Sequence, residues 1–400
     1  MTYNELINQG VNKNNITHKE EDGVQIFSIK ITYFNNESEK LNKIYKASLD
    51  VLNIKKDQDE YRIIIDNSIN ITSKNITRYN FNECTFIQSV YFINCVFLED
   101  ISFKNCHFKA DLSFNNSTFN DNIRFHRSTF HKDAIFLNTT FNKLVDFYWA
   151  RFKSNQQFHL TDFLDRAIFS NATFEKQTQF LYNKVKSSTM ISFENASFKG
   201  ALDLSRANFK CQLHFWNVET NHTPDEYWLC SSDNINKKEV DDIVAYRRMR
   251  ETFRIIKNEF KSSGNLINSL EFKKKEMFIY EKELKVDNNS KMNDQIIVFF
   301  NSISNDFGTK WGKGVLFTFA AALFFYLLFL WSISEYLVFS WDGTGKTIRH
   351  YFEFLNITIW KFKPFGIEDY GSPYVILFVG KIFIGYGYFQ TIQAFRKYSK

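Results

Sequence analysis

The chain has 400 residues and a formal net charge of +6, and 46 residues are phenylalanine while only 14 are glycine and 3 are proline. This length allows about two to four domains and leaves ample room for a hydrophobic core. The modest positive charge does not by itself indicate a nucleic-acid-binding protein. The first residues, MTYNELINQG, lack the basic start and apolar run of a secretory signal, and the five cysteines are expected to be reduced thiols.

The first 75 residues have a mixed composition. Strand-like runs occur at 24–34 and 61–71. A regular repeat follows them, and stacked repeats need a covered end. We therefore interpret residues 1–75 as a region that caps the repeat.

Phenylalanine recurs without a break from Phe81 to Phe180, at spacings that alternate between five and six residues. Neither a helix nor a single strand produces an 11-residue period of this kind, whereas a structural unit stacked on itself does. We therefore predict a narrow solenoid whose interior is filled by phenylalanine. The predicted core includes Phe97, Phe108, Phe114, Phe125, Phe136 and Phe147.

Two further positions repeat beside each phenylalanine. Two residues before it, small side chains alternate with larger, mostly aliphatic ones. Cys84, Cys95 and Cys106 occupy the small position, which serine and alanine fill elsewhere, so we interpret them as core residues rather than metal ligands. Three residues before the phenylalanine, asparagine recurs. Residues 22 apart, such as Asn94 and Asn116, are expected to stack as a ladder of hydrogen-bonded amides.

This pattern, in units such as FINCVFLEDIS and FKNCHFKADLS, resembles the phenylalanine-rich form of the pentapeptide-repeat family. The resemblance implies a right-handed, four-sided parallel β-helix in which one coil takes two 11-residue units. About six coils are expected from Phe81 to Phe215, in a rod ~30 Å long. After Phe180 the pattern slips by two residues and resumes at Phe193, and we expect this insertion to bulge at a corner. The solenoid is predicted to span 76–218.

From Val240 the apolar residues follow a helical period, and Gly264 separates two predicted helices. We expect an αα-hairpin within residues 219–309. It is rich in cations, among them Lys273 and Lys274. These cations are interpreted either as a solvated helix face or as a basic surface beside anionic lipid headgroups, and the second interpretation depends on the membrane segment that follows.

Two stretches in the last region, 310–400, are long and apolar enough to span a membrane. The predicted spans lie near 314–334 and 373–395, and tryptophans such as Trp311 flank the first span as interfacial aromatics do. A buried core helix is the weaker alternative at this length. The basic residues beside the spans hardly decide the orientation. The large region without a signal places both termini in the cytoplasm.

Lys381 is the candidate functional residue, because an ammonium inside a span costs about 2.5–3.5 kcal/mol on insertion scales. It lies about 12 Å into the second predicted span, counted from Pro373. Two interpretations stay open. The side chain either snorkels to the interface, or it lines a polar cavity or an oligomer axis.

Three segments between or within the spans need interpretation. SWDGTGKT (Ser340–Thr347) nearly matches a phosphate-binding loop, but it has serine in place of the first glycine and lies between two spans. FIGYGYF (Phe383–Phe389) contains the GYG of potassium-channel filters but is not followed by a full inner helix, so we interpret its glycines as helix-packing residues. The aromatic segment 347–366 is expected to lie in the interface or to re-enter the membrane.

These features predict a non-enzymatic protein without a cofactor, anchored in a bacterial cell membrane, whose solenoid binds an unknown cytoplasmic protein. The subunits are able to associate through their transmembrane helices, and the order of spans also resembles the layout of two-span ion channels. An oligomeric channel-like protein is therefore the alternative. A DNA mimic that inhibits a topoisomerase is disfavoured, because residues 76–216 hold 16 basic against 12 acidic side chains and a mimic of DNA must be acidic. No nucleic acid is expected as a partner.

Overall fold

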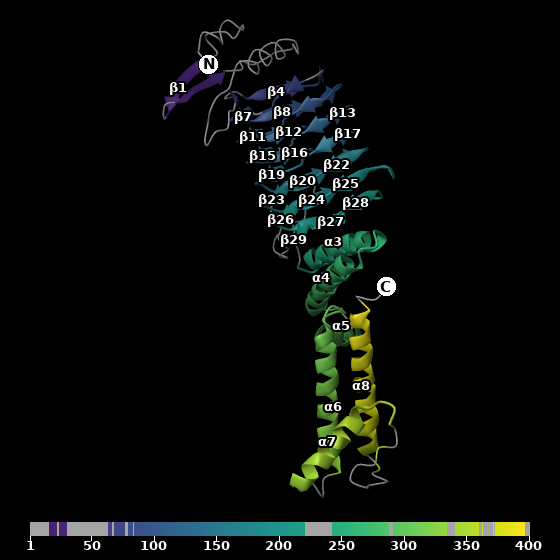
Figure 1. Ribbon diagram of the computed structural model, residues 1–400. Coiled ribbons are helices and arrows are strands. Elements are labelled where there is room, and N and C mark those ends of the chain that lie inside the picture. Colours follow the sequence, from purple (N-terminus) through teal and green to yellow (C-terminus); the bar gives the residue numbers. More distant parts are fainter. Residues whose placement is uncertain are drawn as a thin grey trace. The chain divides into compact units, whose positions relative to one another are not determined.

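The structure is a computed structural model that describes residues 16–21, 24–29, 63–65, 68–76, 79–82, 84–220, 242–287, 291–333, 341–359, 362, 371 and 373–396. The chain divides into two compact units, Met1–Ile255 and Ile256–Lys400. The first consists mainly of short stacked strands, and the second is helical (Figure 1).

The strands of the first unit belong to five sheets. The ten-stranded sheet contains β1 (Ile16–Glu21), β2 (Val24–Ile29), β3 (Ile63–Ile65), β7 (Cys84–Phe86), β11 (His107–Phe108), β15 (Thr129–Phe130), β19 (Arg151–Phe152), β23 (Thr173–Phe174), β26 (Ser197–Phe198) and β29 (Glu219–Thr220). The seven-stranded sheet contains β6 (Tyr79–Asn80), β10 (Ile101–Ser102), β14 (Ile123–Arg124), β18 (Val145–Asp146), β22 (Arg166–Ile168), β25 (Met190–Ser192) and β28 (Gln212–His214).

The three remaining sheets are smaller. One contains β4 (Ile69–Thr72), β8 (Val90–Ile93), β12 (Leu112–Ser113) and β16 (Ala134–Ile135), and another contains β20 (Gln156–His159), β24 (Thr178–Leu181) and β27 (Leu202–Arg206). The last contains β5 (Asn75–Ile76), β9 (Val96–Phe97), β13 (Thr118–Phe119), β17 (Thr140–Phe141) and β21 (Asp162–Phe163).

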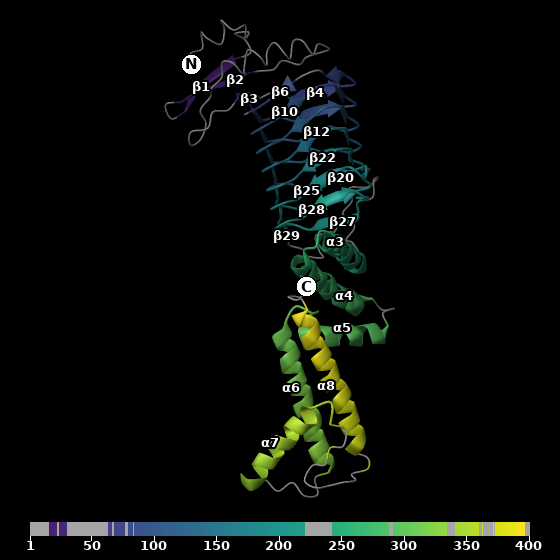
Figure 2. The same ribbon diagram turned by 45° about the vertical axis from the view of Figure 1, so that its right-hand side comes forward.

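Consecutive strands rotate through the sheets and then return to the first one. Strands β7, β8, β9 and β10 lie in four different sheets, and β11 pairs in parallel with β7, so that Phe108 lies opposite Phe86. One coil therefore takes 22 residues, as the two 11-residue units predict. Figure 2 shows the coils stacked on one another. The parallel β-solenoid is confirmed, and its four-sided, right-handed form stays a prediction.

The solenoid has about seven turns, one more than expected. The reason is that its strands begin at β3, before the run of phenylalanines starts at Phe81. The hairpin of β1 and β2 continues the same sheet beyond β3, which agrees with a capping role for the N-terminal region.

The phenylalanine rings form the core by stacking on rings one coil away. Phe125 stacks on Phe103 at 5.4 Å between ring centroids and on Phe147 at 5.0 Å, nearly parallel in both pairs. It meets Phe130 of its own coil edge to face at 5.6 Å. The six phenylalanines predicted in the core are at most 1% exposed. Both ring geometries are favourable for aromatic pairs, so each ring is held along the axis and across it.

The small inward position carries hydrogen bonds as well as packing. Ser117 Oγ donates to Phe92 O at 3.0 Å and accepts from Cys95 N at 3.0 Å. Ser128, Thr139 and Thr161 donate to the backbone of the preceding coil in the same way. The Cys106 thiol also donates to Phe81 O, at 2.6 Å. These hydroxyls and thiols therefore satisfy buried backbone groups and connect neighbouring coils.

The recurrent asparagines stand where the backbone is left-handed. Asn94, Asn105, Asn116, Asn138, Asn171 and Asn195 all have φ between 52° and 57°. Asparagine tolerates this region better than most residues, which explains its choice at the corner. The predicted ladder also forms in places, since Asn138 Nδ2 donates to Asn116 Oδ1 at 3.0 Å. The sequence pattern thus predicted the ladder and missed the backbone requirement beneath it.

The two-residue slip is absorbed in one turn. Phe163 pairs with Val185 across 22 residues, whereas Arg166 pairs with Met190 across 24. Between them Thr189 N donates to Lys186 O at 3.0 Å and closes a turn. The insertion therefore lies between strands β24 and β25, as expected, and the ring stacking resumes beyond it.

The helix α3 (Asp242–Ser262) begins in the first unit. Within this unit Thr252 Oγ1 accepts a hydrogen bond of 3.0 Å from Leu204 N in β27, and Met249 and Phe253 are buried. The C-terminal end of the solenoid is thus covered by helix.

The second unit contains α4 (Leu266–Val286), α5 (Met292–Asn305), α6 (Trp311–Ser332), α7 (Trp341–Leu355) and α8 (Pro373–Phe395). Phe260 and Phe272 pack at 5.5 Å and Lys257 pairs with Glu276 at 2.7 Å, which confirms the predicted helical hairpin. Helices α6 and α8 correspond to the predicted spans. The sequence analysis had not predicted α5, and it had read 347–366 only as an amphipathic segment. The phosphate-loop-like residues Trp341–Thr347 form the first turns of α7.

Replacing Phe125 with alanine should lower the stability of the solenoid by about 3–5 kcal/mol, because it leaves a cavity between two stacked rings. The matched control is Leu137→Ala, since Leu137 is 37% exposed on the same solenoid. Denaturant unfolding of the full chain measures both. Equal unfolding midpoints for the two variants would contradict the stacked core.

His131 should make the stability of the solenoid fall in mild acid. Its partial burial and the neighbouring Lys109 and Lys153 lower its pKa from 6.5 to about 4. The folded protein therefore binds this proton more weakly than the unfolded chain does. The contribution is complete above pH 6.5 and is lost as the pH falls towards 4. Comparing unfolding midpoints at pH 7 and pH 5 should show a smaller loss for His131→Asn than for the unaltered protein.

Candidate functional site

Helices α6 and α8 pack closely because small residues face each other. A Cβ atom on Gly387 would collide with Thr318 Oγ1, and one on Gly314 would lie 2.7 Å from Thr391 Oγ1. The two threonine hydroxyls donate to carbonyls of their own helices, at 2.8 and 2.9 Å. Gly387 therefore is a packing residue, as the sequence suggested. Gly385, the other glycine of the motif, faces open space.

Lys381 is buried between α8 and the end of α7, with 3% of its surface exposed. Its Nζ donates to the carbonyl oxygens of Phe354 and Asn356 at 2.6 Å each, and to that of Glu353 at 3.4 Å. The ring of Phe354 lies 5.4 Å from the ammonium. The side chain thus does not snorkel to an interface. It binds the carbonyl end of a helix within the same chain.

The last carbonyls of a helix lack intrahelical partners and form the negative end of its dipole. Helix α7 ends at Leu355, so the three oxygens around Lys381 are such carbonyls. An ammonium offers three donors and matches three acceptors. Lys381 therefore acts as a charged C-terminal cap that is supplied by another helix.

Tyrosine hydroxyls attach α7 to α6 at two further points. Tyr326 OH donates to Thr347 O at 2.9 Å, and Tyr351 OH donates to Phe319 O at 3.0 Å. On the opposite side of the last turn, Glu353 is held by His350 at 3.1 Å and by Arg349 at 2.9 Å. Hydrogen bonds from His350 and then Arg349 keep the pKa of Glu353 below its ordinary value. Helix α7 is therefore fixed by polar groups on several sides.

A second polar cluster joins α5 to α8. Asn301 Oδ1 accepts from Tyr386 OH and from Gln390 Nε2, both at 3.1 Å. Asn305 Nδ2 donates to the Gln390 carbonyl at 3.1 Å and also meets its side-chain oxygen. The sequence analysis missed this cluster because it did not predict α5. The available signal was the pair Tyr386 and Gln390, one turn apart on a helix that is otherwise apolar.

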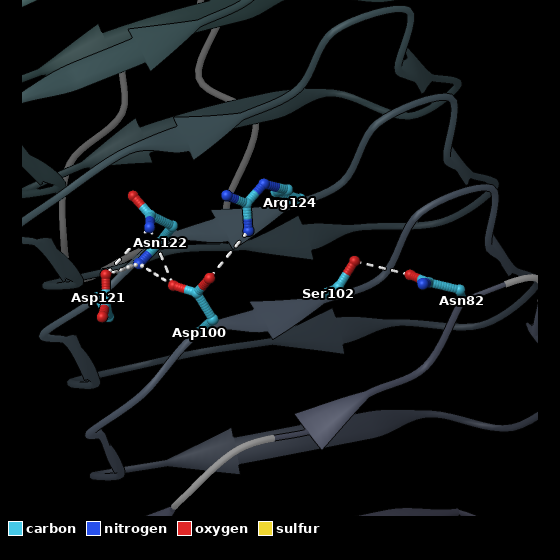
Figure 3. A network of polar contacts seen from close by, with 6 residues as sticks. All are labelled: Asn82, Asp100, Ser102, Asp121, Asn122 and Arg124. Atoms are coloured by element: carbon cyan, nitrogen blue, oxygen red, sulfur yellow. Dashed lines mark hydrogen bonds and ion pairs between the residues drawn. The ribbon is translucent and has the colours of Figure 1, made fainter.

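A polar network also lies on the outer surface of the solenoid (Figure 3). Asp100 accepts from Asn122 Nδ2 at 2.9 Å and from Arg124 at 3.3 Å, and Ser102 donates to Asn82 at 2.7 Å. Partial burial opposes the shift, but the bonds from Asn122 and Arg124 hold the pKa of Asp100 below its ordinary value. These bonds connect residues about one coil apart, so the network stabilises the coil rather than forming an open site.

Among the residues that the structure describes, no group of three His, Cys, Asp or Glu side chains is placed to hold a metal ion. Cys95 and Cys106 direct their thiols at backbone carbonyls, at 3.5 and 2.6 Å. They therefore serve the solenoid core. The features that stand out chemically are Lys381 with its three carbonyls and the cluster between α5 and α8.

Comparison with known proteins identifies the repeat. Residues 75–118 and 92–140 match the family model of pentapeptide repeats (9 copies). The later coils continue the same register in the structure beyond the matched residues. No curated protein matches the chain, and no solved structure matches it. The chain thus carries phenylalanine-rich pentapeptide repeats and two helices that are apolar enough to cross a membrane.

Replacing Lys381 with methionine should destabilise the second unit by about 1.5–3 kcal/mol, because it removes hydrogen bonds from a charged donor and leaves buried carbonyls unpaired. The neighbouring exposed residue Ile382 provides the control, as Ile382→Met. Thermal unfolding of the detergent-solubilised chain, followed by circular dichroism of its helices, measures both. A Lys381→Met variant as stable as the control would show that the cap contributes nothing.

Proposed function

We propose that this chain, with its pentapeptide-repeat solenoid, is a non-enzymatic membrane-anchored binding module. The solenoid presents rigid strand faces and corners to a partner protein in the cytoplasm. Helices α6 and α8 hold it in a bacterial cell membrane. The observation that carries this proposal is the outward surface of these two helices.

Both helices expose apolar side chains along their length. These include Leu316, Leu323, Phe324 and Leu327 of α6, and Val375, Phe378, Ile382 and Phe389 of α8. Only 33% of the most apolar stretch of each helix is buried, whereas the core helix of a soluble protein is mostly buried. An exposed apolar surface of this extent is typical of contact with lipid or with another protein. Its length on both helices favours lipid.

The solenoid has features of a binding surface at its corners. Its interior is filled with phenylalanine, so a partner would meet outward residues. Trp149, Tyr182 and Trp216 are each more than half exposed. The Arg127 guanidinium lies 6.0 Å from the Trp149 ring. Aromatic residues and arginine supply most of the energy at protein interfaces, so these corners are the places where we expect a partner to bind.

The orientation follows from the cations at one end of the helix pair. Lys310 and Lys313 are exposed before and at the start of α6, and Arg396 is exposed just after α8. Basic residues beside spans favour the cytoplasmic side. This places the chain before α6, and with it the solenoid, in the cytoplasm.

An oligomeric two-span channel-like protein is the second candidate. The order of α6, the short helix α7 and α8 favours it. However, the partners of Lys381 all come from its own chain, so the ammonium does not need an oligomer axis to be stabilised. The anchored module therefore is the better-supported function.

Membrane extraction tests the anchor. The full chain should remain in the membrane pellet after alkaline carbonate treatment. Phe324→Asp combined with Leu327→Asp should release most of it, because each charge costs about 2.5–3.5 kcal/mol at the centre of a span. Leu137→Asp, on the solenoid, should not. Release of the unaltered chain would contradict the anchor.

The mass of the detergent-extracted complex, with detergent subtracted, separates the two candidates. A monomer has too few spans to enclose a pore and supports the anchored module. A closed ring of four or more subunits would favour the channel-like protein.

A further inference from the structure

Helix α5 has a row of exposed apolar side chains on one side. Met292, Ile296, Phe299 and Ile303 are spaced by four, three and four residues, so they share one side of the helix. Each is between 41% and 74% exposed. We call these four residues the α5 apolar stripe. In water such a continuous stripe would be unfavourable.

The other sides of α5 are occupied by protein. Asn301 and Asn305 bind α8 through the polar cluster described above. Val298 is buried in a cluster with Leu284 of α4, and Gln295 Nε2 donates to Leu284 O at 3.2 Å. Helix α5 is therefore held firmly by α4 and α8, and the stripe is the side that they leave uncovered.

The position of α5 along the spans follows from Phe300, which adjoins the stripe. Its ring lies 6.5 Å from that of Phe317 in α6 and 5.6 Å from that of Phe383 in α8. Phe317 is about 9 Å into α6 from Trp311, at 1.5 Å per residue. Helix α5 thus lies beside the first turns of the spans. In Figure 2 it runs across the α6–α8 pair, with α4 on its other side.

The charges nearby are arranged in the same sense. Exposed lysines flank α5 and the start of α6, at Lys291, Lys310 and Lys313. Trp311 stacks on Phe395 at 5.1 Å, and this aromatic pair marks the same end of the spans. Cations and an aromatic pair beside an apolar stripe are typical of the boundary between headgroups and acyl chains.

We propose that α5 is an in-plane membrane helix, whose apolar stripe is immersed in the headgroup–acyl boundary of a bilayer that contains anionic lipid. This inference rests on the proposed membrane anchor. The stripe continues the lipid-facing surface of α6 and α8, and the polar cluster between α5 and α8 fixes its depth. Lys291, Lys310 and Lys313 bind lipid phosphates at the same level.

Spin labels test this placement in the full chain, reconstituted in nanodiscs of phosphatidylcholine and phosphatidylglycerol. The background carries Cys211→Ser and Cys230→Ser, since Cys84, Cys95 and Cys106 are completely buried. Single cysteines are then placed at Ile296 and Phe299 in the stripe. Phe324→Cys on α6 serves as the bilayer reference, and Lys285→Cys on α4 serves as the water reference. Accessibility to oxygen and to a neutral nickel complex is measured at each site.

The expected result is a ratio of oxygen to nickel accessibility at Ile296 and Phe299 that lies well above the ratio at Lys285 and below that at Phe324. A stripe ratio equal to that of Lys285, with Phe324 still lipid-like, would overturn the in-plane helix and leave the anchor intact. Low accessibility of the stripe to both reagents would also overturn it, because a protein partner would then cover the stripe. A water-like ratio at Phe324 would overturn the anchor and this inference together.

Discussion

The first unit depends on one contact, the stacking of each phenylalanine ring on the ring one coil away. A ring at 5.0–5.4 Å from both neighbours, as for Phe125, requires every coil to have the same length. The 22-residue register follows from that requirement. The hydroxyls of residues such as Ser117 then bond the backbone of one coil to the next, because the same register brings them to the same place. Where the chain has two extra residues, it forms a turn outside the stack and keeps the rings aligned.

The period could be predicted from the sequence because each coil repeats the same chemistry, and a repeated choice is visible without a structure. The fold class, the course of the insertion and the two apolar helices were all accessible in this way. The left-handed corners were not, because asparagine also suits a side-chain ladder. Arg127, Trp149 and Leu160 occupy the same conformation, which shows that the corner and not the ladder imposes the backbone.

The partners of Lys381 could not be predicted, because they are backbone carbonyls and every residue has one. Only the end of α7 makes these three oxygens available, and α7 itself lies in a segment that could be read as a loop. Helix α5 is a different case. The spacing of its apolar residues, at Met292, Ile296, Phe299 and Ile303, is helical in the sequence. It was missed because the segment is short and follows a longer helical hairpin.

Lys381 shows how the second unit tolerates a buried charge. Removing an ammonium from water is costly, and a single neutral acceptor would not compensate for it. The end of α7 offers two carbonyls at 2.6 Å and a third at 3.4 Å, together with the negative end of the helix dipole. The same contact satisfies carbonyls that an apolar environment would leave unpaired. Lysine and helix end therefore compensate for each other. Because Tyr326 and Tyr351 also hold α7 against α6, a rearrangement of α7 would have to break all of these bonds together. The unit is better suited to holding a fixed position in a bilayer than to opening.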